Sequence, residues 1–478
     1  MPSNNRRKPN ILFIQSDSMD GRTMGCMDHP AAHTPNMDRL AERGVLFTNT
    51  YCNSPQCCPS RASMWSGRYV HQVEAWNNYK GIEPTDPTWR THLDDAGYAT
   101  QTFGKTDYVS GHHSVKARVT AWTASADVKV PKQVPSRPFA KITDERVGGR
   151  RRDWQTVDES LAWLEENARD AQPFMLYSGL NLPHPPFTVG EEWLELIDPD
   201  AIAMPPYEAD LHPVMDFMRM RKGCLGDFSE REIRMIRRVY CAMVSELDAM
   251  VGKLLDKLEA LDLWDSTYVI YLSDHGEMAM EHRQHLKNSL YEPSARVPMM
   301  IAGPGVEQGA RVDDLVSLID VYPTLMDMAG IASPDGLEGV SLMPELYGER
   351  APGRPDYVFS EYHSNFQNTS SFMLRRGDWK YIAYDGYEPQ LFDLQSDPYE
   401  MINLVDAQPD RVETMDADLR AIVDYPKVAD QVRAYNKASF IAWREQMPSE
   451  EVEMYMSDFF AGWGPALKAD IEDWLNEA

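Results

Sequence analysis

The stretch that decides the fold of this chain is ILFIQSD, residues 11–17 of 478. Its four apolar residues are followed by three polar ones, which is typical of a buried parallel strand that ends at the edge of a sheet. A helix is expected to follow, because Thr34 and Pro35 form a start signal and Gly44 is placed to end it. Val45 then begins a second strand, so strands and helices alternate from the start of the sequence.

Strand and helix signals continue to alternate further along the chain. We expect strands over residues 173–178 and 268–273, both rich in apolar residues. Between them Ser229 and Glu232 form a capping box, and apolar residues recur at helical spacing as far as Leu258. This order predicts an α/β fold, with a mixed but mostly parallel sheet between layers of helices.

The organisation changes near residues 348–355, where glycine and proline become frequent. We therefore expect a catalytic α/β domain over residues 1–347 and a smaller C-terminal α+β subdomain over residues 348–478. A turn at Gly377 between two β-prone segments predicts a hairpin of an antiparallel sheet in this subdomain. Residues 449–478 carry eight acidic residues and one basic residue, which predicts an acidic helical tail.

Composition and charge exclude several classes of protein. With 74 acidic and 47 basic residues the net charge is −27, so the chain lacks the basic surface that nucleic acids and anionic membranes require. Six scattered cysteines are too few for a disulfide scaffold. The first residues show no apolar signal segment, and no apolar run reaches membrane-spanning length. We therefore expect a cytoplasmic protein with no nucleic-acid or membrane partner.

A second stretch carries the chemistry, and it reads SPQCCPSRASMWSG over residues 54–67. Pro59 suits the first turn of a helix, which places Cys57 and Cys58 at the helix N-terminus. Free backbone N–H groups favour an anion there, and Arg61 can share it. We expect a tetrahedral anion to bind beside a cysteine-derived nucleophile. From these residues alone, a buried pair of thiols on a helix cap is the alternative.

The run Cys57-x-Pro59-Ser60-Arg61 resembles the signature of the type I, formylglycine-dependent sulfatases. The resemblance implies an alkaline-phosphatase-like fold and the hydrolysis of a sulfate ester. It also implies that a formylglycine-generating maturation enzyme oxidises Cys57, two residues before Pro59, to formylglycine (3-oxoalanine). One hydroxyl of the hydrated aldehyde would attack sulfur, and deprotonation of the other would expel sulfate.

A divalent metal is expected beside this group, where it would polarise the sulfate oxygens. Asp17 and Asp274 each close an expected strand, at the edge where open α/β sheets bind ligands, and His275 follows directly. We expect these three residues and the modified Cys57 to hold the ion. Carboxylates favour Ca²⁺ or Mg²⁺ and imidazole also admits Mn²⁺, and Ca²⁺ is the expected ion. For each aspartate taken alone, a loop or helix cap is the alternative.

Basic residues are expected to surround the sulfate. By resemblance, Lys105 and Lys287 match the family lysines that contact the sulfate or the leaving group, beside Arg61. His184 and His212 are candidates for protonating the leaving group, because histidine titrates near neutral pH. An ordinary solvated charge is the alternative for either lysine.

Within the family, the sequence is most similar to a subgroup that removes 2-O-sulfate from glucuronate at the ends of glycosaminoglycan-type chains. The shared segments include residues 16–22, 103–113, 273–277 and 390–394. The resemblance therefore implies a small sulfated carbohydrate as substrate. The basic or amide groups expected near its carboxylate are Asn78, His112, His113, His282 and Arg283.

Two other functions remain open on sequence alone. One is a phosphonate or phosphate ester hydrolase of the alkaline phosphatase superfamily, because the tetrahedral anions differ mainly in charge. The other is a sulfatase-like binding protein whose cysteine is never oxidised and which holds sulfated ligands without turnover. The net charge of −27 also favours short, soluble fragments as ligands over highly sulfated polymers.

Overall fold

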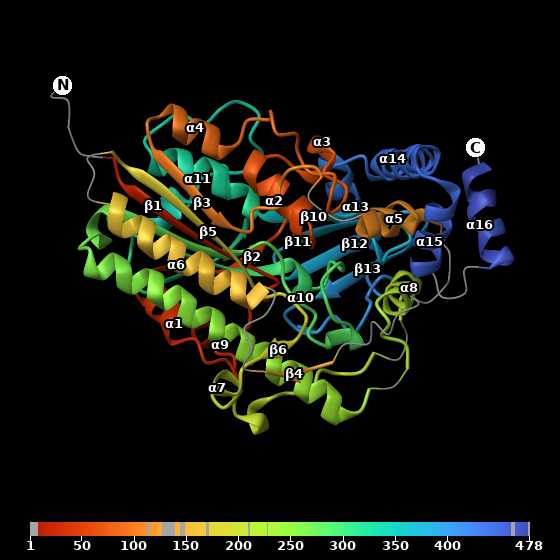
Figure 1. The fold of residues 1–478 in the computed structure, drawn as a ribbon, viewed down its shortest axis with the longest axis horizontal. Helices are drawn as coiled ribbons and strands as arrows, with labels where there is room; N and C mark the ends of the chain where they lie inside the picture. Colours follow the sequence, from red (N-terminus) through yellow and green to blue (C-terminus); the bar gives the residue numbers. More distant parts are fainter. Residues whose placement is uncertain are drawn as a thin grey trace.

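The computed structural model describes residues 8–111, 115–126, 139–143, 149–168, 172–208, 211–226, 228–459 and 464–476. At its centre lies a seven-stranded sheet in the order β3-β5-β1-β7-β8-β2-β9 (Figure 1). The strands are β1 (Asn10–Asp17), β2 (Gly44–Tyr51), β3 (Ala99–Gly104), β5 (Phe174–Pro183), β7 (Thr267–Ser273), β8 (Arg296–Ala302) and β9 (Ala310–Ser317). Neighbouring strands are parallel except where β8 pairs with β7 and β2. The expected mixed, mostly parallel sheet is confirmed.

Helices cover both faces of this sheet (Figure 1). One layer consists of α1 (Pro35–Glu42), α6 (Gly149–Asn167) and α9 (Glu230–Ala260), and the other of α2 (Cys57–Ser66), α4 (Trp89–Asp95) and α11 (Val321–Met328). The sequence of β1 explains the two layers, because successive side chains of a strand point to opposite faces. Leu12 and Ile14 are buried against the first layer, and Ile11 and Phe13 against the second.

Two start and stop signals have different outcomes. The capping box of Ser229 and Glu232 opens α9, where both of its reciprocal hydrogen bonds are present. Gly44 was expected to end α1, but it begins β2 instead. A Cβ atom at this position would lie 2.2 Å from the carbonyl oxygen of Ile301, so the close approach of β2 and β8 requires a glycine.

A four-stranded antiparallel sheet follows in the C-terminal part (Figure 1). Its strands are, in order, β10 (Tyr357–Tyr362), β11 (Ser371–Arg376), β12 (Trp379–Tyr384) and β13 (Tyr387–Asp393). β11 and β12 form the hairpin that the sequence predicts around Gly377. The helices α13 (Pro409–Ile422) and α14 (Tyr425–Gln446) pack on this sheet. The acidic tail forms α15 (Ser449–Phe459) and α16 (Pro465–Asn476), and Met456 and Trp474 pack in one cluster with Trp122.

Buried charges join the C-terminal sheet to the short helix α10 (Glu292–Ala295), which directly precedes β8 of the main sheet. Lys380 on β12 lies 2.7 Å from Glu292 and 2.8 Å from Glu400, and all three side chains are buried. Besides short 3-10 helices, the remaining α-helices and strands are α3 (Val70–Val73), α5 (Val115–Trp122), α7 (Glu191–Leu194), α8 (Pro213–Arg221), α12 (Met343–Leu346), β4 (Lys141–Ile142) and β6 (Thr188–Val189). No helix in these described ranges has the length and apolarity needed to cross a membrane.

Candidate active site and metal centre

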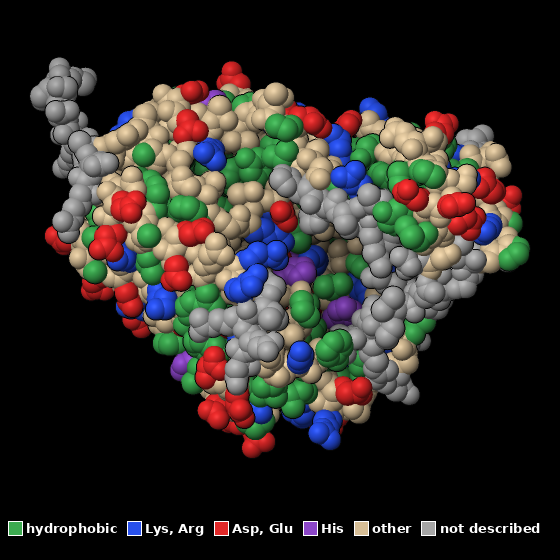
Figure 2. Space-filling model, viewed as in Figure 1, with side chains coloured by type: hydrophobic (Ala, Val, Ile, Leu, Met, Phe, Trp, Pro, Cys, Tyr) green, Lys and Arg blue, Asp and Glu red, His purple; other side chains and the backbone are tan. Residues whose placement is uncertain are grey.

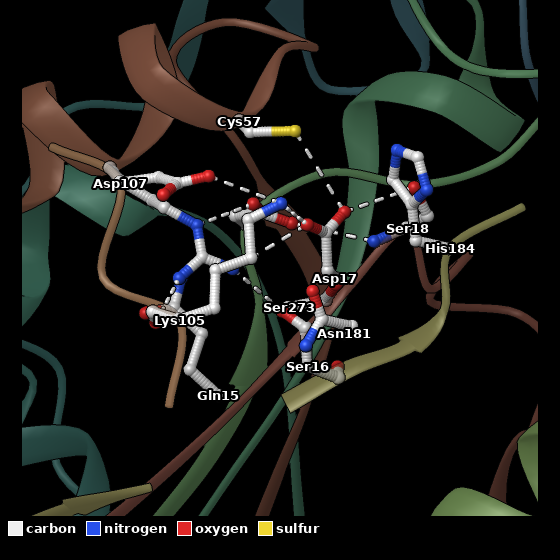
Figure 3. Close-up of polar contacts among 12 residues, drawn as sticks. Gln15, Ser16, Asp17, Ser18, Cys57, Lys105, Asp107, Asn181, His184 and Ser273 are labelled. Carbon is white, nitrogen blue, oxygen red and sulfur yellow. Dashed lines mark hydrogen bonds and ion pairs between the residues drawn. The ribbon is translucent and has the colours of Figure 1, made fainter. Parts of the chain in front are cut away.

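Four potential metal ligands converge at the carboxyl edge of the main sheet. Asp17 is the last residue of β1, and Asp274 and His275 directly follow β7, its parallel neighbour. Cys57 is the first residue of α2. One ligand atom from each of these four buried residues lies within 4.8 Å of the others. The grouping that the sequence predicts is therefore present, and in Figure 3 Cys57, Lys105 and His184 lie around Asp17.

The donor atoms of this cluster fit a divalent cation. Cys57 Sγ lies 3.3 Å from His275 Nε2, which is itself 3.4 Å from Asp17 Oδ1. His275 Nδ1 donates to the carbonyl of Gly276 at 3.0 Å, so Nε2 turns its lone pair towards the carboxylates. Burial raises the pKa of Asp274, with the charge of Arg61 opposing it. A bound cation would favour the ionised carboxylate, and two aspartates with one imidazole are a donor set for such an ion.

Arg61 forms hydrogen bonds that hold part of this cluster in place. Its Nε atom donates to Asp274 Oδ2 at 2.7 Å, and its Nη1 atom donates to the carbonyl of Lys105 and to the Tyr177 hydroxyl. The guanidinium is fully buried, and Ser60 Oγ donates to the Asp274 carbonyl at 2.5 Å. The expectation that Arg61 shares the anion therefore changes. Its hydrogen bonds hold Asp274 and the segment after β3, so it positions other groups.

The two predicted lysines lie beside the cluster of potential metal ligands. The Lys105 ammonium contacts Asp17 Oδ2, and it lies 3.3 Å from Asp107. Lys287 Nζ lies 3.4 Å from Cys57 Sγ and 2.8 Å from His184 Nε2. Burial and the Asp17 charge raise the pKa of the Cys57 thiol, but Lys105 and Lys287 hold that pKa well below its ordinary value. The side chain at position 57 therefore lies in a site that favours an anion.

His184 is oriented by its neighbours. Its Nδ1 atom lies 2.6 Å from the carbonyl oxygen of Pro185, which can only accept, so Nδ1 carries a proton. Its Nε2 atom then accepts from the Lys287 ammonium. The ring follows β5, and it presents Nε2 to the cavity beside Cys57. His184 therefore lies in the cavity that contains Cys57, and its role in protonating a leaving group stays a prediction.

Lys287 is carried on an irregular loop. Six non-glycine residues of residues 279–288 have positive φ, a backbone conformation that the surrounding structure must hold in place. Lys222, which caps the end of α8, provides part of that support. Its buried ammonium donates to the carbonyl of Lys287 and, at 3.1 Å, to Gln284 Oε1. Burial lowers the pKa of Lys222 to about 7. The sequence gives no signal for this lysine, because its partners are distant along the chain.

We expect Lys222→Met to lower kcat/KM about tenfold, because the Lys287 carbonyl and Gln284 amide lose a buried donor worth about 1–3 kcal/mol. Methionine keeps most of the side-chain volume, so the loss reports on the hydrogen bonds. Steady-state kinetics and thermal unfolding measure the two effects. Lys427→Met, at an exposed position in the first turn of α14, is the matched control. An unchanged kcat/KM for Lys222→Met would contradict the supporting role.

A cavity of about 700 Å³ opens beside Cys57. Figure 2 shows a central hollow on this face, where basic side chains and histidine gather. Asn78 lines the cavity as predicted, and its Oδ1 atom accepts the backbone N–H of Cys58 at 3.1 Å. The lining residues that the sequence did not indicate are Asp107, Arg152, Gln155, Thr156, Glu159 and Asn181. Four of them lie on α6. From sequence alone, the polar face of a helix that lines a cavity cannot be distinguished from one that faces solvent.

Several predicted site residues lie elsewhere. His212 caps α8, where Nδ1 accepts from the Val214 amide and Nε2 donates to the Glu388 carbonyl. Both nitrogens are thus used in the neutral form, and the ring is not a leaving-group acid. His282 is buried against Tyr291 and Glu208. The guanidinium of Arg283 donates to the carbonyls of Pro205 and Pro206. His112 and His113 lie outside the described residues.

Comparisons with known proteins agree with this geometry. The sequence model described as Sulfatase matches residues 9–331, and that described as N-sulphoglucosamine sulphohydrolase, C-terminal, matches residues 280–424. Arylsulfatase K of Rattus norvegicus is 44% identical over 467 residues, covering 92% of this chain and 82% of the relative. The solved phosphonate monoester hydrolase of Agrobacterium radiobacter has a TM-score of 0.73 at 24% identity, covering 90% of this chain and 96% of that one. A solved 2-O GAG sulfatase has a TM-score of 0.70 at 26% identity, covering 91% and 94%.

Proposed function

Because this chain belongs to the sulfatase family, we propose that it hydrolyses the 2-O-sulfate ester of glucuronate or a related uronate in a short sugar chain. The observation that carries the proposal is the position of Cys57. It begins α2 at the base of the cavity, between Lys287, His275 and Asp17. The similarity to arylsulfatase K and to the 2-O GAG sulfatase supports the substrate class.

The nucleophile is proposed to be formylglycine made from Cys57 by a maturation enzyme, and the metal to be Ca²⁺. When present, the hydrated aldehyde supplies the hydroxyl that attacks sulfur, and the ion polarises the sulfate oxygens. Asp17, Asp274 and His275 would hold that ion. Lys105 and Lys287 lie beside the position of the sulfate, where their charges stabilise the negative charge of the transition state.

The leaving sugar oxygen needs a proton as the S–O bond breaks. His184 faces the cavity through Nε2, the atom that bonds to Lys287. Because Nε2 accepts from the Lys287 ammonium and carries no proton of its own, we assign to this pair a relay. Lys287 passes a proton to Nε2, Nε2 passes it to the leaving oxygen, and water then reprotonates Lys287. The sugar then departs as an alcohol.

Turnover of matched esters tests the proposed substrate. We expect protein co-expressed with a formylglycine-generating enzyme to hydrolyse a disaccharide that ends in 2-O-sulfoglucuronate, with kcat/KM at least about tenfold above that for an aryl phosphonate monoester. The fold similarity to a phosphonate hydrolase, at 24% identity, does not by itself favour that reaction. Dominant phosphonate turnover would contradict the proposal. A protein that binds the sulfated disaccharide without product release would support a binding role instead.

A further inference from the structure

One wall of the cavity beside Cys57 is a face of helix α6. Arg152, Gln155, Thr156 and Glu159 line it. Their spacing of three, four and seven residues places them on a single side of the helix. Two residues before Arg152, the buried Arg150 pairs with Glu246 on α9 at 2.7 Å. This ion pair fixes the first turn of α6, and with it the direction in which the wall residues project.

Arg152 is an exposed residue of this wall. In the described part of the chain no hydrogen bond or ion pair engages it, whereas Gln155 Nε2 donates to Glu159 Oε1 at 2.8 Å. The other basic side chains of the cavity are already paired, Lys105 with Asp17 and His184 with Lys287. Among the described lining residues, the cationic groups near Cys57 are therefore paired, and the guanidinium of Arg152 is unpaired.

We propose that Arg152 binds the carboxylate of the uronate whose sulfate lies at Cys57, an inference that rests on the proposed function. A planar guanidinium pairs with a planar carboxylate through two parallel N–H···O bonds, which a lysine cannot form. Asp107 and Glu159 line the same cavity, so their carboxylates accept sugar hydroxyls and repel a second sulfate. The cavity is thus suited to a sugar with one sulfate and one carboxylate.

Removing the carboxylate from the substrate and the guanidinium from the protein tests this pairing. The substrates are a 2-O-sulfoglucuronide and the 2-O-sulfoglucoside in which a hydroxymethyl group replaces the carboxylate. We expect Arg152→Ala to lower kcat/KM for the glucuronide about 10- to 100-fold, chiefly through KM. The same variant is expected to change kcat/KM for the glucoside less than about twofold. Arg152→Lys is expected to restore only part of the loss, because it keeps the charge without the fork.

Arg151→Ala is the matched control, because Arg151 is an exposed neighbour on α6 that is not part of the cavity lining. It is expected to leave both substrates unaffected. Equal losses on the two substrates, or no loss on either, would overturn the role of Arg152. The enzyme without any substitution, carrying the formylglycine, is the reference. If it turns over 4-nitrophenyl sulfate but does not hydrolyse the glucuronide, the proposed substrate is overturned, and this inference with it.

Discussion

Replacing Cys57 with alanine is expected to abolish turnover, with kcat falling about 10⁴-fold or more, as for other enzymes that lose a nucleophile. The physical reason is that the polar groups around this position contact or stabilise the side chain of residue 57. Lys287 and His275 lie 3.4 and 3.3 Å from Cys57 Sγ, and both lysines favour an anion there. Alanine leaves this arrangement in place without an atom that attacks sulfur. The folded structure is expected to persist, so circular dichroism should be unchanged.

The neighbouring cysteine provides the control. Cys58 is buried outside the four-residue cluster, and burial raises the pKa of its thiol. Its Sγ atom lies close to Gly81, 2.8 Å from where a Cβ would stand at that residue. Cys58→Ala is therefore expected to retain activity within about threefold, with a modest loss of stability. Mass spectrometry of a peptide over residues 51–68 should locate the oxidised side chain at Cys57. Activity that survives Cys57→Ala, or an aldehyde at Cys58, would contradict the assignment.

The metal-binding cluster was predictable because it depends on strand ends. Asp17 and Asp274 each follow an apolar strand, and parallel neighbours bring their carboxyl ends to one edge whatever their separation in sequence. Cys57 was predictable for a similar local reason, since Pro59 marks the first turn of α2. In both cases local sequence determines where the side chain lies.

Other residues depend on packing between distant segments, which no local pattern encodes. A histidine before a proline is restricted in its backbone, but the direction of its ring is set by its contacts. The ring of His212 is oriented by its hydrogen bonds to the Val214 amide, which cap α8, and to the Glu388 carbonyl. Lys222 and Arg152 were missed for the same reason, because one is buried against a distant loop and the other lies on an exposed helix face. Arg61 lies at the predicted site, but its hydrogen bonds to Asp274 and Lys105 indicate a positioning role and not the predicted contact with the anion.

Removing the proposed divalent metal is the second change expected to have a large effect. We expect exhaustive chelation to lower kcat at least about 100-fold. It should also reduce the melting temperature, because a ligand present at 100 times its Kd stabilises the folded state by about 2.7 kcal/mol. The reason lies in the buried pair of Asp17 and Asp274 beside His275. Burial raises the pKa of Asp274, so a cation beside it would favour its ionised form. Burial acts on Asp17 in the same direction, but Lys105 already holds the pKa of Asp17 well below its ordinary value. Adding Ca²⁺ back should restore both activity and melting temperature.

Two substitutions distinguish the loss of a metal ligand from the loss of a negative charge elsewhere in the site. Asp274→Asn removes a proposed ligand, so metal content by mass spectrometry should fall to background. It also removes the carboxylate that Arg61 Nε contacts at 2.7 Å and leaves the buried guanidinium with Asp17 at 3.9 Å, which is expected to destabilise the fold by up to about 3–5 kcal/mol. Asp107→Asn removes an acid that contacts Lys105 outside the four-residue cluster, and it should retain the metal.

The response to different ions then tests the donor set. Carboxylates with a single imidazole are expected to bind Ca²⁺ and also to accept Mn²⁺, so either ion should restore the chelated enzyme, and the Mn²⁺ form should depend more strongly on His275. Replacing His275 with glutamine, which keeps a polar side chain, is expected to weaken Mn²⁺ binding more than Ca²⁺ binding in calorimetric titrations. An enzyme that keeps full activity and stability after chelation, with no metal detected, would show that Lys105, Lys287 and Arg61 alone balance the two buried carboxylates.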